Sequence, residues 1–193
     1  MSTTLTSDRL TQVAPRFWAR LAGLFYLINV VTSLVTFSGK APHSLSVASG
    51  VASTASYVAV TVLLYYLFRP VNRSLSLVAA LFSLAGCANG VLTPLHLLPF
   101  HIPTLVFFGF YCVLIGYLIV RSTFMPRILG ILMMLAGLGW LTFISKPLST
   151  NLTPYHYIMG GIGEISLTLW LLVMGVNAER WKQQAGGEDR AAG

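Results

Sequence analysis

The sequence predicts an all-α integral membrane protein, a six-transmembrane-helix bundle with both the N- and C-termini cytoplasmic. The 193 residues are 55% hydrophobic and only 9% charged, and the mean hydropathy is +0.76. Six apolar runs are long enough to cross a bilayer, which takes about 20 residues. None shows the alternation of a barrel strand, so we expect helices, which satisfy their own backbone hydrogen bonds in lipid.

The composition argues against a water-soluble protein. Soluble domains carry about 25% charged residues, and a soluble fold of this length could not hide so much apolar surface. The formal net charge of +7 would suggest nucleic acid as the partner of a soluble protein. Here the basic residues flank the apolar runs, where they act as topology signals. We therefore expect the lipid bilayer as the partner of this chain and no nucleic acid.

The first predicted span covers residues 17–38 and follows a cytoplasmic tail over residues 1–16. It begins near Arg16 and Arg20 and could be mistaken for a signal peptide. Its apolar run exceeds the h-region of a signal peptide, about 7–15 residues, and TFSGKAPHS offers no small-x-small cleavage site. We expect this span to be retained as a transmembrane helix.

We predict the other five spans at about 47–68, 74–97, 104–120, 126–145 and 157–178. Two connections, FRPVNRS and RSTFMPR, are short, and each holds a proline that suits a turn or a helix start. Together the spans give a transmembrane domain over residues 17–178. Residues 179–193 form a cytoplasmic tail whose mixed charge, Gly and Ala predict disorder at its end, after about Lys182.

Positive charge decides the orientation of the bundle. With a cytoplasmic N-terminus, only Lys40 and Lys146 lie outside. The residues inside are Arg9, Arg16, Arg20, Arg69, Arg73, Arg121, Arg127, Arg180, Lys182 and Arg190. Short cytoplasmic loops carry such an excess of positive charge. The even number of spans then places both termini in the cytoplasm.

Small and polar residues recur at steps of three and four on several spans. On the third span they are Gly86, Asn89, Gly90, Thr93 and His96. Transmembrane helices associate through such residues, because lipid removes the hydrophobic force between them. We expect these faces to point into the bundle, and packing alone explains most of them.

Several segments together resemble one known family. They are RLAGLFYLINVV, LLYYLFRPVNRSLSLVAALF, LIGYLIVRSTFMPRILGILMMLAGLGWL and GEISLTLWLLVMGVN. The chain is similar over nearly its whole length to the bacterial membrane protein family called domain of unknown function 4386. The resemblance implies a multi-pass protein of the bacterial cytoplasmic membrane. It implies no activity, so it assigns no role to any residue.

One acidic residue, Glu164, lies inside the predicted spans, whereas the other four lie near the chain ends. It is eight residues past His156, so about 12 Å below the outer boundary at 1.5 Å per residue. Asn89 has a similar depth below His96, and Asn29 lies at a comparable level on the first span. Three polar side chains on three helices are thus expected in one layer.

This layer predicts an outward-facing polar pocket. A charged group inside the membrane costs about 2.5–3.5 kcal/mol on insertion scales and usually has a partner or a function. We expect Glu164, Asn29, Asn89, Thr93 and His96 to bind a small amphipathic or lipid-like ligand, or to relay a proton. The alternative is that Glu164 makes a structural hydrogen bond between the last helix and the first and third.

Histidines offer a rival hypothesis, an intramembrane enzyme. All four fall on the outer side, and His96, His101 and His156 could converge where three loops meet, as ligands of a metal or haem. No HxxxH, HExxH or CxxC spacing supports such a site, so we predict no cofactor. The sequence leaves open whether the chain is an enzyme. It also leaves open a structural role, as a homo-oligomer or as the partner of another membrane protein.

The two cysteines and three aromatic residues near the outer side can be explained without a functional site. Cys87 and Cys112 are expected at similar depth on adjacent helices, where a disulfide is conceivable but buried free thiols are the usual case. Tyr155, Tyr157 and Trp140 fit the aromatic belt at a membrane surface.

Overall fold

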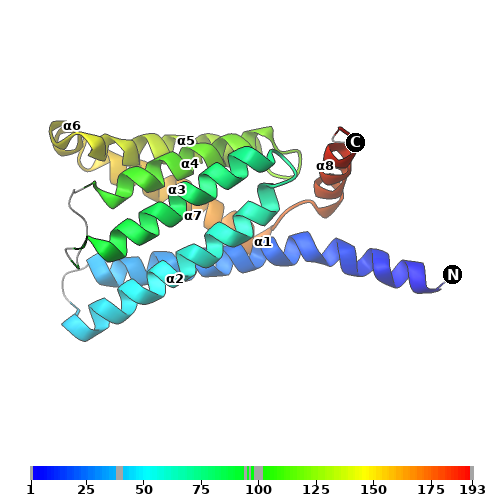
Figure 1. Cartoon of the computed structure of the whole chain (residues 1–193), viewed down its shortest axis with the longest axis horizontal. Coiled ribbons are helices and arrows are strands. Elements are labelled where there is room, and N and C mark those ends of the chain that lie inside the picture. Colours follow the sequence, from blue (N-terminus) through cyan, green and yellow to red (C-terminus); the bar gives the residue numbers. More distant parts are fainter. Residues whose placement is uncertain (1, 38–40, 94, 96, 98–101, 192–193) are drawn as a thin grey trace.

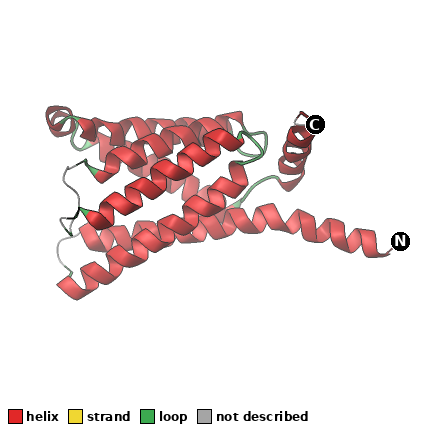
Figure 2. Cartoon of the chain, viewed as in Figure 1, coloured by secondary structure: helices red, strands yellow, loops and turns green. Residues whose placement is uncertain are grey.

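All regular elements in the described part of the chain are helices, with no strand (Figure 2). The structure is a computed structural model that describes residues 2–37, 41–93, 95, 97 and 102–191. The prediction of an all-α chain is confirmed.

Six helices are long and apolar enough to cross a membrane. They are α1 (Ser2–Phe37), α2 (His43–Phe68), α3 (Arg73–Leu92), α4 (Thr104–Arg121), α5 (Arg127–Leu141), which a 3-10 turn extends to Ile144, and α7 (Tyr155–Val173). The chain is thus a multi-pass membrane protein. The apolar part of α1 is Pro15–Thr36, so the residues assigned to an N-terminal tail begin the same helix.

The six spanning helices form a ring. Each packs against its neighbours along the chain, and α7 packs against both α5 and α1. Figure 1 shows that successive helices run in opposite directions along the long axis. The basic end of the ring contains the turns 69–72 and 122–126 and the link 174–177, and the far end contains residues 41–42, 102–103 and 142–154.

Local sequence explains the two tight turns at the basic end. Asn72 caps α3, because its side chain accepts a hydrogen bond from the Leu75 backbone amide at 2.9 Å. Pro126 stands before the first residue of α5, where its fixed φ suits a helix start. Arginines flank both turns, so four of them lie at this end.

The half of the ring next to the basic end is filled by apolar side chains. Leu64, Phe68, Leu118, Ile119 and Leu171, from α2, α4 and α7, are fully buried there and belong to one contiguous core. This layer closes the interior of the ring toward the basic end.

Helices α4 and α5 are in backbone contact at two pairs of glycines. A Cβ placed on Gly116 would lie 2.6 Å from the Gly130 carbonyl oxygen, and one on Gly137 would lie 2.6 Å from the Gly109 carbonyl oxygen. Small residues permit this close approach in lipid. These glycines therefore pack helix against helix inside the chain.

Two shorter helices lie outside the spanning set, α6 (Lys146–Asn151) at the far end and α8 (Ala178–Ala191) at the basic end (Figure 1). We expected disorder after about Lys182, whereas α8 continues to Ala191. The Trp181 indole donates to the Leu67 carbonyl oxygen at 2.8 Å, and Gln184 accepts from Thr123 at 3.1 Å. These contacts hold the first half of α8, whose residues up to Ala185 are mostly good helix formers. Residues 192–193 lie outside the described part.

Candidate functional site

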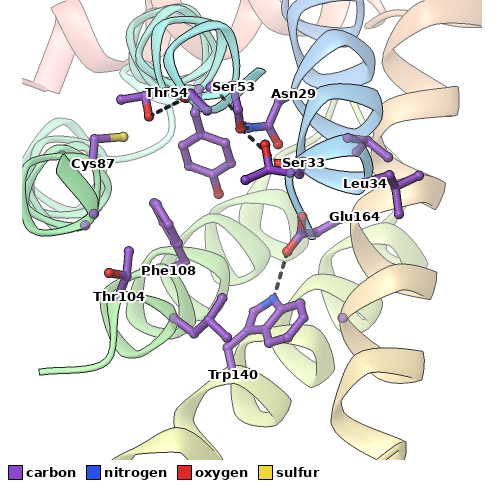
Figure 3. Close-up of a pocket in the computed structure, with 18 of the residues that line it drawn as sticks. Asn29, Ser33, Leu34, Ser53, Thr54, Cys87, Thr104, Phe108, Trp140 and Glu164 are labelled. Atoms are coloured by element: carbon purple, nitrogen blue, oxygen red, sulfur yellow. Dashed lines mark hydrogen bonds between the residues drawn. The ribbon is translucent and has the colours of Figure 1, made fainter. Parts of the chain in front are cut away.

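A cavity of about 630 Å³ lies inside the ring, in the half toward the far end. Its lining residues come from all six spanning helices (Figure 3). Most of the lining surface is apolar, and the polar side chains gather on two walls. One wall belongs to α5 and α7, and the other belongs to α1 and α2.

The α5–α7 wall carries Glu164. The Trp140 indole Nε1–H donates to Glu164 Oε1 at 2.8 Å. A Cβ on Gly160 would collide with the Trp140 ring, so this glycine gives the indole room to reach the carboxyl. Tyr157, Gly160, Gly161 and Glu164 recur at helical spacing and share one face of α7. The sequence of α7 thus turns its single acid into the ring.

The α1–α2 wall is a small hydrogen-bonded cluster. Asn29 Nδ2 donates to Ser53 Oγ at 2.9 Å and to the Ser53 carbonyl oxygen at 3.2 Å. The Ser33 and Ser53 hydroxyls lie 2.9 Å apart. Figure 3 shows this cluster facing the cavity opposite Trp140. Asn29 Nδ2 thus has two acceptors on Ser53, and no hydrogen bond to Asn29 Oδ1 is seen among the described residues.

Three tyrosines pack together where the cavity closes. Tyr57 lines the cavity, and its ring lies 5.8 Å from the rings of both Tyr26 and Tyr111, centroid to centroid. The buried hydroxyls of Tyr26 and Tyr111 have no hydrogen-bond partner among the described residues. Buried polar groups of this kind usually bind water or a ligand.

The structure brings together some of the expected pocket residues and separates others. Glu164 and Asn29 line the same cavity. Asn89 does not line it, because its Nδ2 donates to Thr104 Oγ1 at 2.8 Å and to the Ile102 carbonyl oxygen at 3.0 Å, which ties α3 to the start of α4. Thr93 lies 3.5 Å from Asn89 Oδ1 and also stays outside the lining. His96 lies outside the described residues.

Of the histidines expected to bind a metal, the structure describes His156, whereas His96 and His101 lie outside the described residues. The His156 imidazole is buried against Phe143, at 4.7 Å between centroids, and Tyr157, at 4.3 Å. Neither of its ring nitrogens has a hydrogen-bond partner in the described part of the chain. No group of three His, Cys, Asp or Glu side chains forms a metal site within that part.

The two cysteines are free and buried. Cys87 lines the cavity from α3, whereas Cys112, on α4, is fully buried and not among the lining residues. A disulfide between them is therefore absent from the structure, and each thiol fills space as a small apolar side chain.

Comparison with known proteins identifies the family. Residues 91–175 match the family described as domain of unknown function (DUF4386). An uncharacterized protein of Archaeoglobus fulgidus is 32% identical over 127 residues, which span 61% of this chain and 76% of that protein. The chain belongs to the DUF4386 family. No solved structure matches it.

The match to DUF4386 covers the α5–α7 wall but not the α1–α2 wall. Trp140 and Glu164 lie within residues 91–175, whereas Asn29, Ser33 and Ser53 precede them. In this DUF4386 protein the cavity is thus completed by helices outside the matched region.

The cavity residues that the sequence did not assign to the pocket include Trp140, Ser53 and Tyr57. Trp140 was assigned to the aromatic belt, yet its indole faces inward. A usable signal was present, because a buried indole N–H needs an acceptor and Glu164 is the one carboxylate in the spans. Ser53 gave a weaker signal, because it belongs to a stripe of serines at steps of three and four on the second span, a pattern that predicts a face toward the bundle. Tyr57 gave no such signal.

Proposed function

We propose that this DUF4386 protein lies in the bacterial cytoplasmic membrane with both termini in the cytoplasm. We propose further that its cavity binds a small amphipathic or lipid-like molecule whose polar group contacts Glu164. The observation that carries this proposal is a carboxyl side chain, oriented by Trp140, on the wall of a mainly apolar cavity within membrane-spanning helices. A charged group is costly inside the membrane, and a neutral side chain at this position would avoid that cost. The presence of an acid therefore favours a functional role.

The size and chemistry of the cavity support ligand binding. Small-molecule sites measure about 300–1,000 Å³ and combine apolar walls with a few placed polar groups, and the volume of about 630 Å³ falls within this range. The polar groups on both walls are already oriented by hydrogen bonds. A ligand therefore loses little free energy in ordering them.

The surroundings of the cavity favour binding over proton relay, the other function that the sequence suggested. Leu64, Phe68, Leu118, Ile119 and Leu171 are fully buried between the cavity and the basic end. A proton path needs a chain of polar groups or water, and this described layer interrupts it. Apolar side chains thus separate Glu164 from the basic end of the ring.

The test uses the protein in nanodiscs and a long-chain alcohol brominated close to its hydroxyl group, which quenches tryptophan fluorescence. Because Trp140 lines the cavity, wild type should show saturable quenching beyond that of probe dissolved in the bilayer. Glu164→Leu should weaken binding at least about tenfold, whereas Glu179→Gln, which changes an exposed acid on α8, should not. Equal affinity in wild type and Glu164→Leu would contradict the proposal.

One observation favours the rival enzyme hypothesis, the buried imidazole of His156 without a hydrogen-bond partner in the described residues. A metal bound there with His96 and His101 would supply that partner. Metal and haem analysis of purified protein decides between the two hypotheses. Stoichiometric zinc, iron or haem that is lost in His156→Ala would favour the enzyme, and its absence from wild type would leave ligand binding as the better account.

A structural role through the glycine faces has weaker support. The glycines of α4 and α5 contact each other, so they are not available to a partner. Crosslinking in membranes tests for a fixed neighbour, which the structural role requires and the binding proposal does not.

A further inference from the structure

Helices α1 and α7 are in close contact at one level and leave open space at another. A Cβ on Gly23 of α1 would lie 2.7 Å from the Leu172 backbone nitrogen of α7, so the two helices touch at the basic half. Gly161 lies 11 residues before Leu172 on α7, and a Cβ there would have no atom within 4 Å. Because Gly161 is on the cavity-lining face of α7, the two helices have diverged at this level.

Side chains at this divergence belong both to the cavity and to the outer surface. Leu34 of α1 and Ile165 of α7 line the cavity, yet 66% and 48% of their surfaces are exposed. Residues with both properties mark an opening, which we call the α1–α7 seam. The outer surface of a spanning helix faces acyl chains, so this seam connects the cavity with the lipid phase.

Polar groups line the cavity next to this seam. Glu164 directly precedes Ile165 on α7, and Ser33 directly precedes Leu34 on α1, and all four residues line the cavity. A molecule whose polar group contacts Glu164 can therefore place its aliphatic part between Leu34 and Ile165.

We propose that the cavity takes a single-chain amphiphile directly from the bilayer, with its headgroup at Glu164 and its tail leaving through the α1–α7 seam past Gly161. This inference rests on the proposed function. The headgroup is a hydrogen-bond donor, such as a hydroxyl or an amine, because the walls offer acceptors: the Glu164 carboxyl and Asn29 Oδ1. The open position at Gly161 accounts for one tail, so the proposal is for a single-chain molecule.

A second boundary, between α2 and α3, provides the matched control. Gly50 of α2 also lines the cavity, and a Cβ there meets nothing within 4 Å. Lining residues of α2 and α3 include the small or polar Thr54, Cys87 and Gly90. An alkyl tail is better solvated between Leu34 and Ile165 than between these groups. Added bulk at Gly161, but not at Gly50, should therefore obstruct the tail.

The experiment compares two probes that share a headgroup in nanodisc-embedded protein: the long-chain brominated alcohol and a short-chain brominated alcohol without the long tail. Gly161→Leu should weaken binding of the long-chain probe at least about tenfold and leave the short-chain probe unaffected. Gly50→Leu tests the other route and should not lower the affinity for the long-chain probe relative to the short-chain probe. Glu164→Leu should lose both. Gly161→Ala, which adds only an unopposed Cβ, serves as the folding control, and its thermal unfolding should show no loss of stability.

The outcomes separate this inference from the function on which it rests. If Gly161→Leu binds the long-chain probe normally while Glu164→Leu loses both probes, the α1–α7 route is overturned and the binding function stands. If Gly50→Leu obstructs the long-chain probe and Gly161→Leu does not, the tail leaves between α2 and α3 and the proposal is again overturned. If wild type binds neither probe, both the function and the route fail.

Discussion

Glu164 holds its position through the indole of Trp140, and this single hydrogen bond is open to measurement. Trp140→Phe keeps an aromatic ring but removes the donor to Glu164 Oε1. We expect the free energy of unfolding to fall by about 1–2 kcal/mol, the range for a hydrogen bond to a buried polar or charged group. Reversible unfolding in mixed detergent micelles measures this loss.

Trp170 provides the matched control for that substitution. Its buried indole nitrogen has no hydrogen-bond partner among the described residues, so Trp170→Phe removes no bond. In double-mutant cycles with Glu164→Leu, Trp140→Phe should show coupling and Trp170→Phe should show none. Equal coupling for both tryptophans would mean that the Trp140–Glu164 bond contributes nothing to stability.

Two adjacent glycines on α7 should respond oppositely to the same change. A Cβ on Gly160 would collide with the Trp140 ring, whereas a Cβ on Gly161 would meet nothing within 4 Å. Gly160→Ala should destabilise the protein by about 1–3 kcal/mol through overpacking. Gly161→Ala should be neutral or stabilising by up to about 1 kcal/mol, because alanine is the better helix former. Thermal unfolding of the two variants gives the sign, and the same sign for both would refute the geometry.

At the scale of helices, the α4–α5 contact should be sensitive to added volume. Gly116 and Gly130 face each other so closely that a Cβ on either would lie 2.6 or 2.5 Å from the carbonyl oxygen of the other. Gly116→Ala and Gly130→Ala should each lower the free energy of unfolding by about 1–3 kcal/mol. Gly50→Ala, on open space in α2, is the control and should not. Unfolding in detergent reports the difference, and a neutral result at Gly116 would show that α4 and α5 can separate without cost.

The helices also show why part of the structure was predictable from the sequence and part was not. Six apolar runs flanked by basic residues are enough to predict six spanning helices, because a long apolar run without strand alternation can satisfy its backbone in lipid only as a helix. Helix α8 was missed, since its order depends on contacts of Trp181 and Gln184 with Leu67 and Thr123, which are distant in sequence. Tertiary contacts of this kind are not encoded in local composition.

For the whole molecule, the sequence predicted part of the cavity lining but not all of it. Counting residues from the outer boundary placed Glu164, Asn29 and Asn89 at one depth, but depth does not specify direction around a helix. Asn89 turns toward the start of α4 and Asn29 toward the cavity. The partner of Glu164 was missed for a related reason: Trp140 is 24 residues away along the chain, on α5. Only the packed ring determines which polar groups meet.

The orientation of the whole ring in the membrane is the last property that the charge distribution predicts. The described arginines of the two tight turns, of α1 and of the start of α8 lie at the basic end, whereas Lys146 begins α6 at the far end. With the basic end in the cytoplasm, alkaline phosphatase fused after residue 193 should be inactive and green fluorescent protein there should fluoresce. Phosphatase inserted after Asn151, in the link between α5 and α7, should be active. The reverse pattern would place Glu164 and its cavity in the cytoplasmic half of the bilayer, so the same amphiphile would have to come from the inner leaflet.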